Sequence, residues 1–362
     1  MTTFRKTTMR AAAAASMVAV MFLATGCANT AGPDASQTPS PTPKVYVTAP
    51  LTGVEYEEGT NAALAGSSVA CKIDNLDVAR PQLGLNSTDI VFDEMVEGGL
   101  TRLVAVFHSK MPNAVGPVRS IRPMDPDIIA PFGGIACYSG GQLKFVQMMQ
   151  ATDVFNANET EEQGKGTFSR ATDREAPHNV IVDLGKLQGA HPEIAPPAAQ
   201  FKFSKVSMDA GTVDVPSGGT AVDMVKIYYP SALAQWTPSA DRSVWLRTQD
   251  GKPHTDAADG SQIRATNVVV LQVSIDRQYG YVPKTVMVSS GTAWIFVAGK
   301  YIKGTWSKES QTAPILLHHE TGQDVVLSPG NTWVELMPTA PEGSIKIVET
   351  PKPKPTPSAT KK

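Results

Sequence analysis

The residues best suited to chemistry lie in one stretch, residues 89–122, which is dense in charged side chains. Four carboxylates and three arginines alternate there with strand-forming residues and glycine turns; they are Asp89, Asp93, Glu94, Glu97, Arg102, Arg119 and Arg122. Ionised groups rarely occupy strands, because a sheet that buries one face cannot bury an unpaired charge cheaply. Guanidinium groups held by carboxylates suit the recognition of phosphate or carboxylate anions. The stretch therefore predicts either an anion-binding site or an internal network of ion pairs.

Arg102 follows a predicted hairpin turn at Glu97-Gly98-Gly99. With a two-residue turn, Arg102 lies opposite Met95 and has Asp93 and Glu97 as diagonal neighbours. With a three-residue loop, Glu94 lies directly opposite Arg102. Both registers bring a carboxylate to the guanidinium. The contact would either fix the register as an internal ion pair or orient Arg102 toward an anionic ligand.

Arg119 and Arg122 lie on a segment bounded by Pro117 and Pro123, which excludes a continuous helix. A strand would send the two side chains to opposite faces, whereas a turn would bring them together. Paired arginines on such a rigid segment suit phosphate or carboxylate recognition. The alternative is that they form salt bridges with the hairpin acids or with acids shortly after the segment.

Four further polar residues are candidates for the same site: Asn75, Arg80, His178 and Asn179. Polar binding or a structural role suits His178 better than a catalytic triad. Ser139 invites comparison with a G-x-S-x-G nucleophile, but Cys137 replaces the first glycine. A helix cap explains Ser139 without any catalytic role.

The N-terminus predicts export and lipidation. A positive segment without acids precedes an apolar stretch at residues 11–23, which is too short to span a bilayer. It ends in Ala24-Thr25-Gly26-Cys27, which resembles a bacterial lipobox. We therefore expect a signal peptide at 1–26, lipid attachment at Cys27 and a location on the extracytoplasmic face of the cell membrane; an ordinary cleaved signal is the alternative.

Removing 1–26 takes away three basic and no acidic residues and changes the formal charge from −2 to −5. This negative charge argues against nucleic acid as a general partner.

Composition divides the rest of the chain into two folded regions between low-complexity ends. Residues 27–47 form a Pro-, Ser- and Thr-rich linker, and residues 347–362 form a Pro- and Lys-rich tail. Between them we expect a mixed α/β domain at 48–207 and a mostly β domain, barrel- or sandwich-like, at 218–346. The fold class is α+β, and the Pro-, Gly- and Ala-rich residues 188–217 are the expected junction.

Individual elements follow from local signals. The strands expected in the first region are 69–73, 89–96, 100–108, 135–138 and 180–182. Asp125-Pro126 predicts the cap and first position of a short helix. A longer helix should start after Ser139, with Gln142 completing a capping box.

Cys71 and Cys137 are the cysteines that follow Cys27, and each lies in an apolar strand-like run. They are either small buried hydrophobes or, in an oxidising compartment, a disulfide pair. No metal-binding spacing or cofactor motif occurs, so we expect neither a metal nor a cofactor.

Several motifs together resemble the YerB-like bacterial lipoproteins. They are Lys72-Ile73-Asp74-Asn75, residues 79–85, residues 89–91, residues 97–102, residues 116–120, residues 176–179, residues 267–270 and residues 329–333. The resemblance spans about residues 68 to 340 and implies a two-domain, membrane-anchored extracytoplasmic protein. An association with cell-wall synthesis is an expectation at the level of the family, and the resemblance supplies no catalytic residues.

These observations support two functional hypotheses. The first is a lipoprotein that binds an anionic cell-envelope component, such as a wall polymer, or a wall-synthesis partner through Arg102, Arg119 and Arg122, oriented by Glu94 and Glu97. The second is an enzyme acting on envelope glycan or phosphodiester, with Glu94 or Glu97 as general base and His178 as acid. An enzyme should place a carboxylate and His178 in one cleft beside an arginine.

Overall fold

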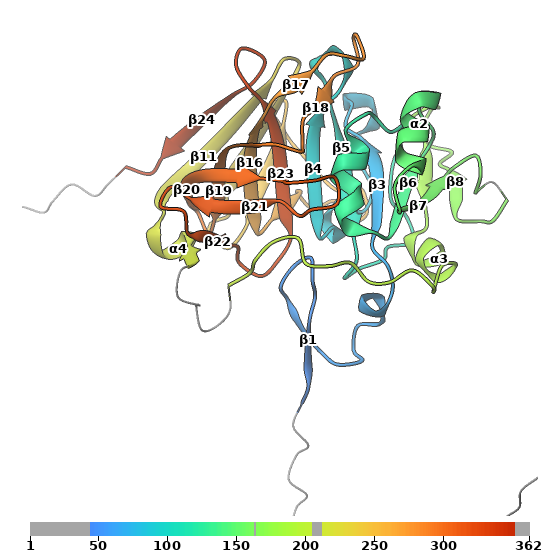
Figure 1. Ribbon diagram of the computed structural model, residues 1–362, viewed down its shortest axis with the longest axis horizontal. Helices are drawn as coiled ribbons and strands as arrows, with labels where there is room; N and C mark the ends of the chain where they lie inside the picture. The colour runs from blue at the N-terminus through green and yellow to red at the C-terminus, as the bar shows by residue number, and fades with distance from the viewer. Residues whose placement is uncertain (1–43, 163, 205–211, 352–362) are drawn as a thin grey trace, which may run out of the picture. The chain divides into compact units, whose positions relative to one another are not determined.

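The apolar runs of the N-terminal region form strands that are buried along their whole length. In the computed structural model, which describes residues 44–162, 164–204 and 212–351, these strands make one mixed sheet (Figure 1). In spatial order they are β4 (Ile90–Met95), β5 (Thr101–Phe107), β3 (Val69–Asp74), β6 (Ile135–Tyr138) and β7 (Phe155–Asn158). β5 is antiparallel to both of its neighbours, whereas β3, β6 and β7 are parallel.

Short elements surround this sheet. They are the pair β1 (Tyr46–Thr48) and β2 (Glu55–Glu57), the pair β8 (Phe168–Arg170) and β9 (Val180–Val182), and the helices α1 (Asp125–Ile129), α2 (Leu143–Gln150) and α3 (Leu184–Gly189). Figure 1 shows α2 beside β6 and β7.

Both predicted helices exist, but their starts differ from the prediction. α1 has Pro126 in its first turn and Met124, not Asp125, as its N-cap. The predicted start of α2 at Ser139 is wrong, because α2 begins at Leu143 after the cap residue Gln142. Gly140 has φ +109° and so interrupts any helix between Ser139 and Gln142.

The C-terminal region consists almost entirely of strands, as its short apolar runs and turn residues predict. Its elements are β10 (Thr212–Asp214), α4 (Val215–Gly218), β11 (Thr220–Tyr229), β12 (Ala232–Pro238), β13 (Trp245–Gln249), β14 (Lys252–Pro253), β15 (Arg264–Ala265), β16 (Asn267–Val273), β17 (Ile275–Asp276), β18 (Lys284–Thr285), β19 (Ser290–Val297), β20 (Lys300–Ser307), β21 (Leu316–His319), β22 (Asp324–Val326), β23 (Thr332–Pro338) and β24 (Ser344–Glu349). β11 pairs with β20 through its first residues and with β12 and β24 through the rest.

One sheet connects the two regions. β23 is parallel to β16 on one side and to β4 on the other, so that Thr332 lies opposite both Asn267 and Ile90 (Figure 1). Both large hydrophobic clusters contain residues from the two regions. For example, Phe92 of the N-terminal region and Leu336 of the C-terminal region belong to the same cluster. The fold is therefore α+β, with a mixed N-terminal region and a strand-rich C-terminal region that share a continuous sheet.

The ends of the folded part extend slightly past the predicted boundaries. β1 includes residues of the expected linker, and β24 continues to Glu349, which pairs with Val222 on β11. The expected signal peptide, Cys27, the expected linker before residue 44 and the expected tail beyond residue 351 lie outside the described residues. Among the residues that the structure describes, no helix is long and apolar enough to cross a membrane.

Candidate anion-binding site

The hairpin between β4 and β5 has the three-residue register. Glu94 lies opposite Arg102, and the loop is Glu97–Gly99. Gly98 and Gly99 have φ +70° and +71°, a left-handed conformation that favours glycine. A Cβ on Gly99 would also lie 2.5 Å from Cβ of Pro230, so this loop packs closely on the C-terminal region.

The expected contact between Glu94 and Arg102 does not form. The Glu94 carboxylate binds Lys72 Nζ instead, and Lys72 Nζ also donates to Asp125 Oδ1 at 2.9 Å. All three side chains are fully buried. Burial lowers the pKa of Lys72 to about 8, opposed by the Asp125 carboxylate. A buried lysine requires counter-charges, so Glu94 is committed to Lys72 and does not orient Arg102.

Arg102 is a buried arginine, 8 % exposed, without a carboxylate partner among the described residues. Its Nη1 donates to the carbonyl oxygen of Ser120 at 2.9 Å. Burial, followed by the nearby charges of Arg122 and Arg119, lowers the pKa of Arg102 to about 10. The guanidinium thus remains charged at neutral pH and lies close to two further arginines.

The proline-bounded segment carries those two arginines and fixes them through its backbone. Arg119 N donates to the Lys72 carbonyl of β3, and Ser139 N donates to the Arg119 carbonyl. Arg122 N donates to Asp125 Oδ2 at 2.6 Å. The segment therefore brings both arginines to the end of the sheet where Arg102 lies.

Each of these two arginines has a carboxylate of its own. Arg119 Nε lies 3.0 Å from Asp74 Oδ2, and Arg122 Nε donates to Glu97 at 2.8 Å. Burial raises the pKa of Glu97, but hydrogen bonds from Arg122 and from the backbone, together with the charges of Arg122 and Arg102, outweigh it and leave that pKa below its usual value. Glu97 thus contacts Arg122 and not Arg102. We call Arg102, Arg119 and Arg122 the arginine site.

His178 joins the arginine site through a residue that the sequence did not single out. Its Nδ1 lies 2.6 Å from Asp74 Oδ2, the same oxygen that faces Arg119. The His178 side chain is 20 % exposed, whereas Asp74 is fully buried. The Arg119 guanidinium also donates to the carbonyl oxygen of Pro177 at 3.3 Å.

Two other candidates, Asn75 and Asn179, have structural partners. Asn75 Nδ2 donates to Thr101 Oγ1 at 2.8 Å, and its Oδ1 accepts from Gln82 at 3.1 Å. The Asn179 oxygen accepts from Arg170 at 2.9 Å. Both side chains are engaged by these partners, so they support the loops of the site.

Arg80 lies outside the arginine site. Its Nη2 is 3.2 Å from Asp77 and 2.9 Å from Asp250. It lines a surface hollow of about 290 Å³ that also includes His254 and Lys252. The prediction that Arg80 belongs with the three other arginines is wrong, because the 3₁₀ turn that precedes it directs it toward the C-terminal region.

Sequence reasoning missed a second buried charged cluster, which joins β4 to the C-terminal region. Arg247 on β13 binds Asp93 through Nη2 and lies 3.7 Å from Glu335 through Nε. Tyr229 and Trp236 donate to Glu335 at 2.9 and 2.8 Å. We call Asp93, Arg247 and Glu335 the buried triad. All three charged side chains are at most 1 % exposed, so no ligand reaches them.

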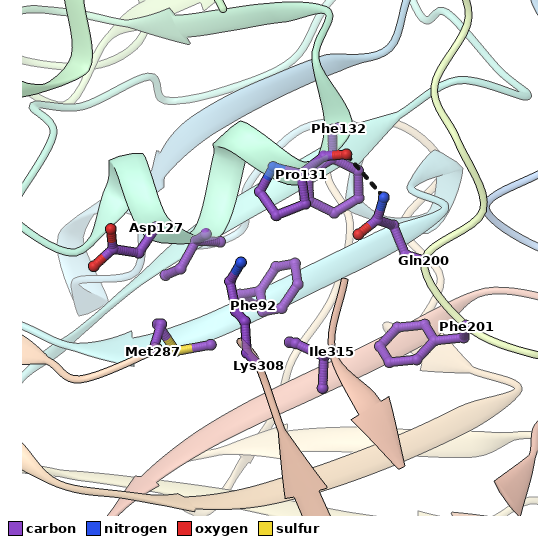
Figure 2. Close-up of a pocket in the computed structure, with 10 residues that line it drawn as sticks. Phe92, Asp127, Pro131, Phe132, Gln200, Phe201, Met287, Lys308 and Ile315 are labelled. Carbon is purple, nitrogen blue, oxygen red and sulfur yellow. Dashed lines mark hydrogen bonds between the residues drawn. The ribbon is translucent and has the colours of Figure 1, made fainter. Parts of the chain in front are cut away.

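A narrow crevice lies between α1, β4 and the C-terminal region (Figure 2). Figure 2 shows Phe92, Phe132 and Ile315 around it and the hydrogen bond from Gln200 to the Pro131 carbonyl, 2.9 Å long. Its free volume is about 10 Å³, which is room for about one water molecule. The crevice is therefore a packing seam and not a ligand pocket.

Cys71 and Cys137 face each other in register on the parallel strands β3 and β6, and both are buried free thiols in the structure. The described residues contain no group of three or more histidine, cysteine and acidic side chains arranged to hold a metal. Trp306 and Trp333 are each 1 % exposed and pack in the core.

Comparison with known proteins identifies the family. The profile described as "Protein of unknown function (DUF3048) N-terminal domain" matches residues 51–195, and that of the corresponding C-terminal domain matches residues 225–334. The chain belongs to this DUF3048 family. A family member from Bacillus subtilis (strain 168), "Putative lipoprotein YerB", is 26% identical over 308 residues, which cover 82% of this chain and 88% of that protein.

The crystal structure of the YerB protein from Bacillus subtilis has the same fold, with a TM-score of 0.70 and 24% identity. The match covers 83% of this chain and 99% of that one. The predicted resemblance to the YerB-like family is thus confirmed, and the relative is itself described as a lipoprotein. The descriptions of the DUF3048 family assign no function, so the function must be argued from the site.

Proposed function

We propose that this DUF3048 protein is a lipoprotein, anchored through Cys27 on the extracytoplasmic face of the cell membrane, that binds an anionic component of the cell envelope at the arginine site. Arg102 carries the proposal. It is a buried guanidinium with no carboxylate partner among the described residues, and it lies beside two arginines that are already held in place.

The charges of the site favour an anionic ligand. Burying a charge without a counter-charge costs several kcal/mol, on the order of 3–5 for a broken buried pair. Arg119 and Arg122 contact Asp74 and Glu97, whereas Arg102 bonds to a backbone carbonyl and has no carboxylate within salt-bridge distance among the described residues. Asp74 and Glu97 act on Arg102 only from farther away. A phosphate or carboxylate would supply a directly bonded negative partner for Arg102 and accept hydrogen bonds from its remaining N–H groups.

The location narrows the source of that anion. The similarity to "Putative lipoprotein YerB" and the lipobox-like segment that ends at Cys27 support a site outside the cytoplasm, where anionic wall polymers and lipid headgroups are abundant. An acidic segment of a wall-synthesis protein would satisfy the same arginines. The enzymatic hypothesis gains no support from Glu94, which is fully buried against Lys72. The other carboxylate in that hypothesis, Glu97, is bonded to Arg122.

Ligand binding can be tested with the full-length lipoprotein in detergent micelles. The probe is a short poly(glycerol phosphate), whose phosphodiesters each carry one negative charge, titrated by calorimetry. Arg102→Gln should weaken binding by about 10- to 100-fold, because a charge-assisted hydrogen bond contributes about 1.5–3 kcal/mol. Arg277→Gln removes a surface arginine paired with Glu342 and is the matched control. Equal affinity in the wild type and Arg102→Gln would reject the site.

Anchoring is a separate test. Cells that express the wild type should incorporate labelled palmitate into the protein and retain it in the membrane fraction. Cys27→Ala should lose the label and leave the membrane fraction. Labelling that persists in Cys27→Ala would place the lipid elsewhere.

A further inference from the structure

We propose that Asp74 and His178 form a general-base dyad beside the arginine site, and that the protein hydrolyses phosphodiesters bound there. The proposal rests on the anion-binding function and adds a reaction to it. It differs from the enzymatic hypothesis drawn from the sequence, which assigned the carboxylate role to Glu94 or Glu97.

The first argument is the geometry of the dyad. Asp74 Oδ2 is 2.6 Å from His178 Nδ1, and Asp74 Oδ1 accepts from Leu76 N at 3.1 Å. A buried carboxylate bonded to Nδ1 fixes the tautomer of a histidine and leaves its Nε2 free to take a proton. His178 Nε2 has no partner among the described residues, and the side chain is 20 % exposed. The proton-accepting atom is therefore accessible, whereas the orienting carboxylate is not.

The second argument is that one oxygen links the dyad to the arginine site. Asp74 Oδ2 lies between His178 Nδ1 at 2.6 Å and Arg119 Nε at 3.0 Å. An anion held by Arg119 and Arg102 would thus lie next to the imidazole. Arginines beside a general base are the arrangement that stabilises charge developing on a phosphoryl group.

The third argument concerns the pairing of Arg102, which favours one substrate class. Among the described residues, Arg119 and Arg122 each contact a carboxylate, whereas Arg102 has none within salt-bridge distance. A ligand with one negative charge is enough to pair with Arg102. A phosphodiester carries one negative charge at neutral pH, whereas a phosphomonoester carries nearly two. The site therefore favours the diester as substrate and the monoester as product to be released.

The reaction follows from these positions. His178 Nε2 takes a proton from water as the water oxygen forms a bond to phosphorus. The bond from phosphorus to the leaving alkoxide breaks, and the alkoxide takes a proton from solvent. His178 then returns its proton to solvent, so that one diester and one water give one monoester and one alcohol. Asp74 positions the imidazole, and Arg102 and Arg119 stabilise the phosphoryl oxygens.

The test uses the full-length lipoprotein in detergent micelles with bis(p-nitrophenyl) phosphate as the diester and p-nitrophenyl phosphate as the monoester. We expect the wild type to release p-nitrophenol from the diester faster than from the monoester. His178→Gln should lower the rate about 10²- to 10⁴-fold, because that is the contribution of a general base. His319→Gln is the matched control, since His319 is a half-buried histidine bonded to Thr321.

Chemical rescue separates proton transfer from a structural role. His178→Ala should lose activity and regain part of it with added imidazole, whereas Arg102→Gln should show no rescue. Unchanged rates in His178→Gln, or no hydrolysis by the wild type, would overturn the dyad. If poly(glycerol phosphate) still bound in an Arg102-dependent manner, the anion-binding function would stand without the reaction. If nothing bound, both proposals would fail.

Discussion

Replacing Asp93 with asparagine should change how the stability of the protein depends on pH. Asp93 and Glu335 share Arg247 in the buried triad. Oδ2 of Asp93 binds Arg247, whereas Oδ1 of Asp93 has no hydrogen-bond partner among the described residues. Burial and then the charge of Glu335 raise the pKa of Asp93 to about 8. Glu335 has two further donors, Tyr229 and Trp236, so the carboxyl that keeps its proton is Asp93.

The direction in which the unfolding free energy changes with pH follows from the number of protons bound by the native and unfolded states. The unfolded carboxyl titrates at 3.8 and the folded one at about 8, so between these values the native state binds one more proton than the unfolded chain. The free energy of unfolding then falls as pH rises, by about 1.4 kcal/mol per pH unit for this one group. From pH 6 to 7.5 the loss is roughly 2 kcal/mol. Asp93→Asn cannot lose a proton and should not show this loss.

The assay is urea unfolding of the wild type and Asp93→Asn at several pH values from 5.5 to 7.5. The quantity to follow is the difference in unfolding free energy between the two proteins, because all other titrating groups cancel in it. We expect the advantage of Asp93→Asn to grow by roughly 2 kcal/mol between pH 6 and 7.5. Asp241→Asn is the control, since hydrogen bonds from Ser239 and Ser243 lower the pKa of that exposed carboxyl to about 2. A difference that stays constant with pH for Asp93→Asn would mean that Asp93 is ionised in the native state, and the reasoning would be refuted.

Three further outcomes are expected. Lys72→Met should destabilise the protein by about 3–5 kcal/mol in chemical denaturation, because it leaves two buried carboxylates unpaired, whereas the exposed strand lysine variant Lys303→Met should change little; equal effects would contradict the buried ion pairs. Gly99→Ala should lower the melting temperature more than Gly98→Ala, since both have positive φ but only a Cβ on Gly99 meets a neighbouring proline at 2.5 Å; similar losses would argue against that close contact. The two buried cysteines of the mature lipoprotein should resist maleimide in the native state and react in denaturant without reductant; no reaction in denaturant would reveal a disulfide.

The sequence predicted the strands of the N-terminal region and, as one of two alternatives, the register of the hairpin between β4 and β5. Period and turn signals located β3 to β6 and the three-residue alternative for the Glu97–Gly99 loop. The partner of each charge was harder to predict, because it depends on which strands become neighbours. Lys72 stands in an apolar run, and a charge in such a run was the available signal that it has buried partners. Asp74 appeared only within the Lys72-Ile73-Asp74-Asn75 motif.

The buried triad shows why the partners of the other buried charges could not be predicted from the sequence. Asp93 and Arg247 are separated by 154 positions in the chain. They meet only because β23 inserts next to β4, and no local pattern encodes that parallel pairing. The charge density of residues 89–122 thus reflects two different features: the arginine site near one end of β4 and β5, and internal ion pairs that hold the regions together.

The pairing of β4 with β23 has a consequence for how this protein can be divided. A fragment that ends near residue 204 would leave β4 with one edge unpaired, and a fragment that starts near residue 212 would do the same to β23. Each fragment would also expose half of both hydrophobic clusters, so each alone should aggregate through its open edge. Expressed together as two separate chains, the halves have complementary edges and should reassemble. The junction is thus a place to cut the chain for a split reporter of lipoprotein export, but not a place to isolate a domain.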